Sequence, residues 1–134
     1  MDVVAFTGFS GSGKTTLIIR LIEHFIGQGR RVGAIKHTHH PLNEEVRGDT
    51  GRFQAAGADP VILAREGEAV IFTAEGTSRT TFEHPGDLLG RFTTDVVLVE
   101  GFKHLGEWTQ ISISADARPS LESVLAELDR IWRS

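Results

Sequence analysis

Residues 8–15 combine glycines, a lysine and a threonine in a spacing suited to holding phosphate. They read Gly-Phe-Ser-Gly-Ser-Gly-Lys-Thr, which fills every fixed position of the pattern G-x-x-x-x-G-K-[ST]. Glycines let backbone N–H groups approach an anion, and a helix that starts here adds its own N–H groups. Lys14 is predicted to bridge the β- and γ-phosphates, and the Thr15 hydroxyl to bind Mg²⁺. The predicted nucleoside triphosphate site comprises Gly8, Ser10, Gly11, Ser12, Gly13, Lys14, Thr15 and Thr16.

Two acidic residues follow expected strands and are candidates for the metal ion. Glu100 comes directly after the apolar run Val96–Val99, which is typical of a buried parallel strand. Open α/β sheets bind ligands at the carboxyl ends of their strands, so Glu100 is predicted to serve Mg²⁺ as a Walker-B carboxylate does. Asp49 follows the second expected strand and is predicted to bind the metal or position an attacking water, as a catalytic partner of Lys14. The alternative for Asp49 is a helix cap formed together with Thr50.

A basic cluster leaves the second expected strand as Lys36-His37-Thr38-His39-His40. Lys36 and His37 are predicted to contact the phosphates of the nucleotide or of a second ligand. Three imidazoles within four residues could instead bind a transition metal, although the adjacent His39 and His40 point apart in an extended chain. A solvated loop without a specific role is the third interpretation.

Two later residues are candidates for the nucleotide site. Lys103 follows Glu100 closely and could neutralise phosphate charge, or it could simply be solvated. The chain has no Asn-Lys-x-Asp sequence for recognising guanine, which leaves Asp116 as the candidate acceptor for the base. An Asx turn before the last helix would explain Asp116 equally well.

Length and composition limit the class of protein. The 134 residues are predicted to form a single nucleotide-binding domain, 1–134. A net charge of −4 argues against a broad basic surface for nucleic acid, and the absence of cysteine excludes disulfides and thiolate metal sites. No apolar stretch is long enough to cross a membrane, so we expect a soluble cytoplasmic protein.

The apolar pattern alternates between strands and helices, which predicts an α/β fold with a mostly parallel sheet between layers of helices. The first helix should bury a stripe that includes Phe25 and Ile26. Two short apolar runs around Arg65–Glu68 predict an inserted β-hairpin. The expected strands are Val3–Thr7, Arg31–His37, Val61–Ala64, Ala69–Thr73, Val96–Val99 beside the first, and Ile111–Ser114; the expected helices are Gly13–Ile26, Gly51–Ala56, Pro85–Leu89 and Pro119–Trp132.

Several of these segments together resemble the MobB family of molybdopterin-guanine dinucleotide biosynthesis adaptor proteins. The segments are Gly8–Thr15, Ile35–His40, Asp49–Arg52 with Ala55–Ala58, and Val97–Lys103. The resemblance implies a P-loop NTPase-like fold, a homodimer, GTP and Mg²⁺ as ligands, and weak GTPase activity. It also implies a role with molybdopterin or with the guanylyltransferase that joins GMP to it. The chain lacks a segment between Lys103 and the last helix, where the family's pattern no longer supports Asp116 as the guanine acceptor.

Two other functions remain open at this point. Slow hydrolysis fits an adaptor, because no residue stands out as a strong base for activating water. A small kinase or NTPase acting on a metabolite would need an arginine-bearing lid, for which Arg47–Arg52 is the candidate. A metal-delivery GTPase would use His37, His39 and His40.

Overall fold

The computed structural model describes residues 1–8, 13–42, 48–102, 107–114 and 119–133. Most of the predicted site residues fall within these ranges. Those that lie outside the described residues are Ser10, Gly11, Ser12, Lys103 and Asp116.

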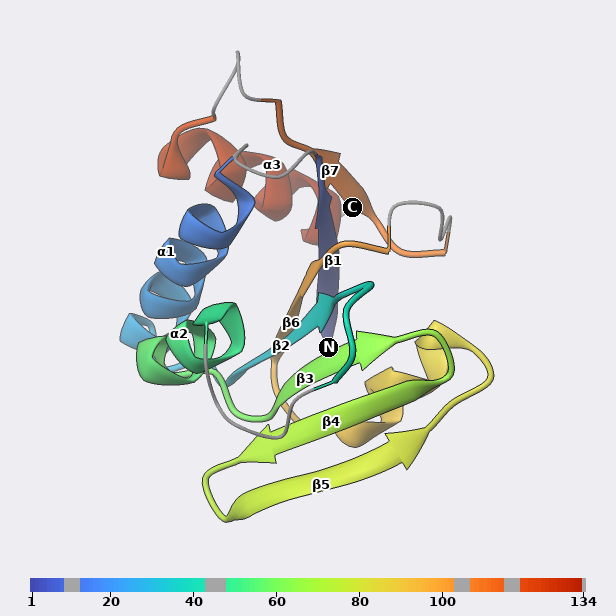
Figure 1. Cartoon of the computed structure of the whole chain (residues 1–134). Coiled ribbons are helices and arrows are strands. Elements are labelled where there is room, and N and C mark those ends of the chain that lie inside the picture. The colour runs from blue at the N-terminus through green and yellow to red at the C-terminus, as the bar shows by residue number, and fades with distance from the viewer. Residues whose placement is uncertain (9–12, 43–47, 103–106, 115–118, 134) are drawn as a thin grey trace.

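Within the described residues, seven strands form one sheet in the order β5-β4-β3-β2-β6-β1-β7 (Figure 1). Neighbouring pairs are parallel except where β4 pairs with β3 and with β5. The predicted strand next to the first is confirmed, because β6 pairs with β1, and the predicted hairpin is β3 with β4. The strands are β1 (Asp2–Thr7), β2 (Val32–His37), β3 (Val61–Arg65), β4 (Glu68–Thr73), β5 (Gly76–Thr81), β6 (Val96–Glu100) and β7 (Gln110–Ser112).

The α-helices of the described part cover one face of this sheet, as Figure 1 shows. They are α1 (Lys14–Gly27), α2 (Gly48–Ala56) and α3 (Leu121–Arg133). Alternate strand residues such as Val4, Phe6 and Leu98 point toward these helices and are fully buried. None of the helices in the described ranges is long and apolar enough to cross a membrane.

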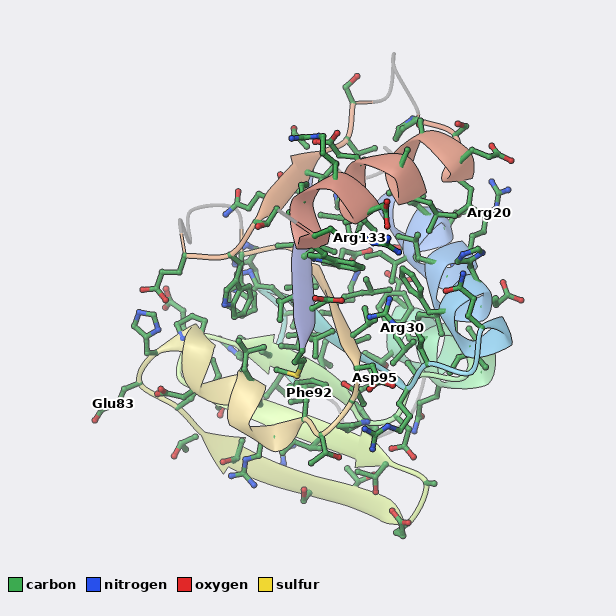
Figure 2. The ribbon with its side chains drawn as sticks, turned by 180° about the vertical axis from the view of Figure 1, so that it is seen from behind. Arg20, Arg30, Glu83, Phe92, Asp95 and Arg133 are labelled. Atoms are coloured by element: carbon green, nitrogen blue, oxygen red, sulfur yellow. The ribbon has the colours of Figure 1, made fainter. Side chains whose placement is uncertain are left out.

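The opposite face is covered by η1, a 3₁₀ helix over Pro85–Arg91 (Figure 2). It begins at a capping box, in which His84 Nδ1 accepts from the Gly86 N–H and Asp87 accepts from the His84 N–H. Leu88 and Phe92 then pack against the second set of alternate strand residues. This helix is the third layer of the predicted fold, and it extends the predicted helix Pro85–Leu89 by two residues.

Three expectations about the elements need correction. Ile26 was predicted to face the core, but it is 39% exposed, because it lies at the edge of the α1 stripe and packs toward Gly57. Helix α2 begins at Gly48 rather than Gly51, so Asp49 belongs to its first turn. Strand β5 was not predicted, because its sequence Gly-Thr-Ser-Arg-Thr-Thr is polar and mostly exposed at the edge of the sheet.

Gly33 on β2 is required by the packing of η1 against the sheet. A Cβ at this position would lie 2.3 Å from Phe92 Cδ1 and 3.3 Å from Thr94 Oγ1. The Phe92 ring is 7% exposed, so it has little space into which to move. We expect Gly33→Ala to lower the free energy of unfolding by about 1–3 kcal/mol, measured by urea denaturation. The control is Gly27→Ala, whose Cβ would meet nothing within 4 Å; equal losses for both variants would contradict this explanation.

Candidate functional site

The predicted site residues meet at the carboxyl edge of the sheet. Gly8 follows β1, Lys36 is near the end of β2, and Glu100 ends β6. Helix α1 starts at Lys14, directly after Gly13, which adopts a left-handed conformation with φ 93°. The parallel strand order therefore brings the phosphate-loop helix and the strand-end carboxylate to the same place.

Strand register places Lys36 beside Glu100. The two residues are direct partners in the parallel pairing of β2 with β6. Because successive side chains on a strand point to opposite faces, Lys36 and Glu100 share the face covered by α1 and α2. His37, the next residue on β2, belongs to the other face.

Four side chains on this helical face form one hydrogen-bonded cluster, which we call the acidic cluster: Thr15, Lys36, Asp49 and Glu100. The Lys36 ammonium donates to Asp49 Oδ2 at 2.6 Å and to Glu100 Oε2. Thr15 Oγ1 lies 2.5 Å from Glu100 Oε1 and 3.3 Å from Asp49 Oδ2. Both carboxylates are therefore shared between one ammonium and one hydroxyl.

The electrostatics of the acidic cluster favour a cation. The Glu100 side chain is only 6% exposed, and that of Lys36 is 23% exposed. Burial alone would lower the pKa of Lys36, but its hydrogen bonds to Asp49 and Glu100 and their negative charges raise that pKa above the ordinary value. Lys36 is therefore charged at neutral pH, and two carboxylates with one ammonium leave a net charge of −1.

The residues of the acidic cluster fit Mg²⁺ as a ligand. Carboxylate and hydroxyl oxygens from Thr15, Asp49 and Glu100 are the hard donors that this ion prefers. The Lys36 ammonium, held between both carboxylates, already marks a position for positive charge. Asp49 is the second residue of α2 rather than the residue before the helix, and its carboxylate contacts Lys36 and lies 3.6 Å from Arg52 Nη1. The contacts of Asp49 therefore join it to the acidic cluster and to Arg52.

The described part of the phosphate loop is organised around Lys14. Its ammonium donates to the Gly8 carbonyl at 2.6 Å, which brings the charge back over the loop. The first N–H groups of α1 have no partner within the helix, and the cap residue Gly13 has no side chain to satisfy them. The N–H groups at a helix N-terminus and an ammonium together suit a phosphate chain. Thr16 is exposed on the first turn of α1.

A cavity of about 800 Å³ runs along this edge. It begins at Gly8 and Lys14, passes Lys36 and Glu100, and continues to the β3–β4 turn and the start of η1. Strands β1 and β3 are three positions apart in the sheet, so the cavity extends roughly 14 Å sideways at about 4.8 Å per strand. Its far end is lined by His39, Arg65, Glu66, Gly67, Phe82, Glu83 and Pro85.

Stacked rings form one wall of the cavity. His37 stacks on Phe102 with ring centres 4.3 Å apart, and Phe102 meets the edge of Trp108 at 5.7 Å. Gly101 makes this turn possible, because it has φ 104° and a Cβ there would lie 2.8 Å from His37 Cβ. His39 contacts His37 edge to face at 4.8 Å. Among the described residues, no set of three or more His, Asp or Glu side chains is placed to hold a metal ion.

The structure thus separates the predicted site residues into two groups. One group is the acidic cluster of Thr15, Lys36, Asp49 and Glu100, with Lys14 and Gly8 beside it. The other is His37, which is part of the aromatic wall. Sequence reasoning missed the bonds from Lys36 to both carboxylates and the contribution of Arg65 and Phe82 to the cavity. The alternation of side chains along a strand could have indicated the bonds of Lys36, because it places Lys36 and His37 on opposite faces of β2.

Comparisons with known proteins identify the family of the chain. The family described as "MobB: Molybdopterin guanine dinucleotide synthesis protein B" matches residues 3–130 of the chain. The chain belongs to the MobB family. This confirms the predicted family resemblance, and all the segments that carry it lie within the matched range.

Individual MobB relatives are longer than this chain. It is 41% identical over 104 residues to the molybdopterin-guanine dinucleotide biosynthesis adapter protein of Haemophilus influenzae, covering 77% of this chain and 58% of the relative. It is 38% identical over 111 residues to the protein of the same name from Escherichia coli, covering 78% and 61%. The crystal structure of Bacillus subtilis MobB aligns with a TM-score of 0.52 and 28% identity, over 94% of this chain and 73% of that one. The chain therefore spans about three fifths of the length of these two adapter proteins.

The burial of His37 predicts how stability depends on pH. Burial and the neighbouring His39 lower the pKa of His37 below its ordinary 6.5, and Glu66 acts weakly in the opposite direction. The unfolded chain then takes up a proton near pH 6.5 that the folded chain takes up only at lower pH. The stabilising contribution of neutral His37 is therefore complete above pH 6.5 and is lost as the pH falls toward the folded pKa.

We expect an NMR titration to place the His37 imidazole below pH 6.5, and His37→Gln to flatten the loss of unfolding free energy between pH 7 and 5. The exposed neighbour His40 provides a control for the substitution itself, because His40→Gln should leave the free energy of unfolding at pH 7 almost unchanged. A His37 resonance that titrates above 6.5 would contradict the assignment.

Proposed function

We propose that the chain binds GTP together with Mg²⁺ and acts as an adapter in the attachment of GMP to molybdopterin. The observation that carries the proposal is that Thr15, which follows Lys14 in the phosphate loop, lies within hydrogen-bond distance of Asp49 and Glu100. This joins a phosphate-binding helix N-terminus to an oxygen-rich metal site. Membership of the MobB family and the names of the two adapter relatives support the pathway.

Each site residue has a distinct role in this proposal. Lys14 and the N–H groups at the start of α1 hold the phosphates, together with the rest of the loop from Gly8 to Thr16. Thr15, Asp49 and Glu100 would hold Mg²⁺, which when bound neutralises charge on the phosphate oxygens. The predicted roles of Lys103 at the phosphates and of Asp116 at the guanine base concern residues outside the described ranges and stay predictions.

Slow hydrolysis follows from the contacts of the carboxylates. Glu100 accepts from Lys36 and Thr15, and Asp49 accepts from Lys36, so hydrogen-bond donors already occupy both oxygens of Glu100 and Oδ2 of Asp49. A general base needs a free oxygen within hydrogen-bond reach of the attacking water. We therefore propose a weak GTPase whose main task is to hold the nucleotide.

The cavity beyond Lys36 supports a second ligand next to the phosphates. It extends past the strand that carries Lys36 toward Arg65 and Phe82, where a polyphosphate alone would leave space. Under the adapter proposal this space takes the pterin ligand. The same cavity favours the alternative of a small kinase, whose acceptor would occupy it; phosphorylated product after incubation with GTP and a pterin would identify that alternative.

Two further expectations stay predictions. The homodimer is implied by the family resemblance, and the cytoplasmic location is expected from the sequence. Size-exclusion chromatography with light scattering measures the oligomeric state. Fractionation of cells that express the chain measures its location.

Removing the phosphate-loop ammonium provides the first test of GTP binding. We expect Lys14→Ala to abolish measurable GTP affinity in calorimetry, because no other described side chain extends its ammonium over Gly8. The circular dichroism spectrum should stay unchanged, since Lys14 is outside the core. Arg20→Ala is the matched control on the outer side of the same helix (Figure 2), and it should bind GTP as the wild type does. Equal affinity of Lys14→Ala and Arg20→Ala would refute the role of Lys14.

The adapter role is tested with the guanylyltransferase reaction. Added wild-type chain should increase the yield of molybdopterin-guanine dinucleotide from GTP and molybdopterin, whereas Lys14→Ala should not. The chain alone should hydrolyse GTP at no more than about 0.01 s⁻¹, the range of unassisted GTPases. Turnover of several molecules per second by the chain alone would show an enzyme rather than an adapter.

A further inference from the structure

We propose that the Lys36 ammonium serves as an internal cation that closes the metal site until a nucleotide arrives. In this arrangement a divalent ion reaches Asp49 and Glu100 only when Lys36 leaves them, and the phosphates of the nucleotide are what draw it away. The inference rests on the metal site of the proposed function and adds a control on when that site can be filled.

The first observation is that Lys36 and a metal ion would need the same oxygens. Its ammonium contacts Asp49 Oδ2 and Glu100 Oε2 directly, so an ion cannot use these two atoms while the ammonium is there. The Thr15 hydroxyl lies against the other oxygen of Glu100. Lys36 and a divalent ion therefore compete for oxygens of the same two carboxylates.

Charge supports the same conclusion. Glu100 is almost fully buried, and a carboxylate in such a place requires a positive partner. Lys36 is that partner among the described residues, whereas Asp49 also has Arg52 at 3.6 Å. Replacing the ammonium by a divalent ion would raise the charge of the cluster by one unit, but it would leave Lys36 in need of an anion. A nucleotide with its metal ion supplies both charges at once.

Lys36 has a place to which it can move. Its side chain is 23% exposed and lines the same cavity as Lys14 and Gly8 at the phosphate-loop end. A lysine stem has four rotatable bonds and can redirect its ammonium without moving the strand. The ammonium released from Glu100 can therefore turn toward a phosphate held by Lys14. Metal binding should accordingly depend on the nucleotide in the wild type and become independent of it without Lys36.

The test measures Mn²⁺ binding by electron paramagnetic resonance in the absence of nucleotide. Wild-type chain should bind Mn²⁺ weakly, and Lys36→Met should bind one ion about tenfold more tightly or better, because a repelling charge is gone and two carboxylates are open. Lys36→Arg keeps a cation and should stay weak. Arg65→Met also removes a cation from the cavity, but Arg65 pairs with Glu68 and not with Asp49 or Glu100. This variant should therefore bind Mn²⁺ as weakly as the wild type.

Thermal unfolding provides the second measurement. Lys36→Met should melt roughly 10 °C lower than the wild type, because Glu100 loses its partner, and millimolar Mn²⁺ should restore most of this loss. Mn²⁺ should leave the melting temperature of the wild type almost unchanged. Tight binding of Mn²⁺ to the wild type, or no gain in a folded Lys36→Met, would overturn the proposal.

An experiment on the unmodified chain covers the case in which Lys36→Met does not fold. Mn²⁺ broadens the NMR signals of residues near it, so signals around Glu100 should broaden only when a non-hydrolysable GTP analogue is present. Broadening that is equal without the analogue would overturn the proposal. Calorimetry with GTP separates the two hypotheses: a chain that binds no GTP contradicts the proposed function, while the Mn²⁺ titrations of the wild type and Lys36→Met still decide the role of Lys36.

Discussion

The buried carboxylate of Glu100 is the constraint on which the geometry of the site depends. It ends a strand whose other residues are fully buried, yet it retains only 6% of its side-chain surface. A carboxylate in this position is stable only with close positive or hydrogen-bond-donating partners. Lys36 on β2 and Thr15 on α1 provide them, so the requirement of one side chain fixes two neighbouring elements at the carboxyl edge of the sheet. Asp49 extends the same network to α2.

Because side chains alternate along a strand, the two faces of the sheet carry different groups at this edge. Lys36 and Glu100 point toward the helices and form the charged region next to the phosphate loop. His37 and Phe102 lie on the other side, where stacked rings line the cavity. Charged and aromatic surfaces thus adjoin without competing for the same space. A ligand that spans a phosphate chain and a flat ring system would meet both surfaces in succession.

The strongly patterned parts of the chain were predictable from the sequence, and the weakly patterned parts were not. Helix α1 and strand β6 have apolar residues at regular intervals, and their positions were predicted within a residue or two. Strand β5 has no apolar residue, because an exposed edge strand needs none, so periodicity could not reveal it. The start of α2 was missed for a similar reason, since its only buried residues are Thr50 and Phe53.

The same distinction applies to the candidate site. Residues within one contiguous motif could be predicted from the sequence, whereas contacts between segments far apart in the sequence could not. Lys14 and Thr15 lie in a contiguous motif whose spacing encodes its geometry, and Glu100 could be placed at a strand end from its apolar neighbours. The bond between Lys36 and Glu100 joins residues 64 positions apart, and it depends on β2 lying beside β6 in one particular register. A shift of that register by one residue would turn Lys36 away from the carboxylate and leave Glu100 buried without its cation. Register is set by the packing of both sheet faces together. The phosphate-binding motif can therefore be recognised in the sequence, whereas the pairing of Lys36 with Glu100 is determined only by the folded chain.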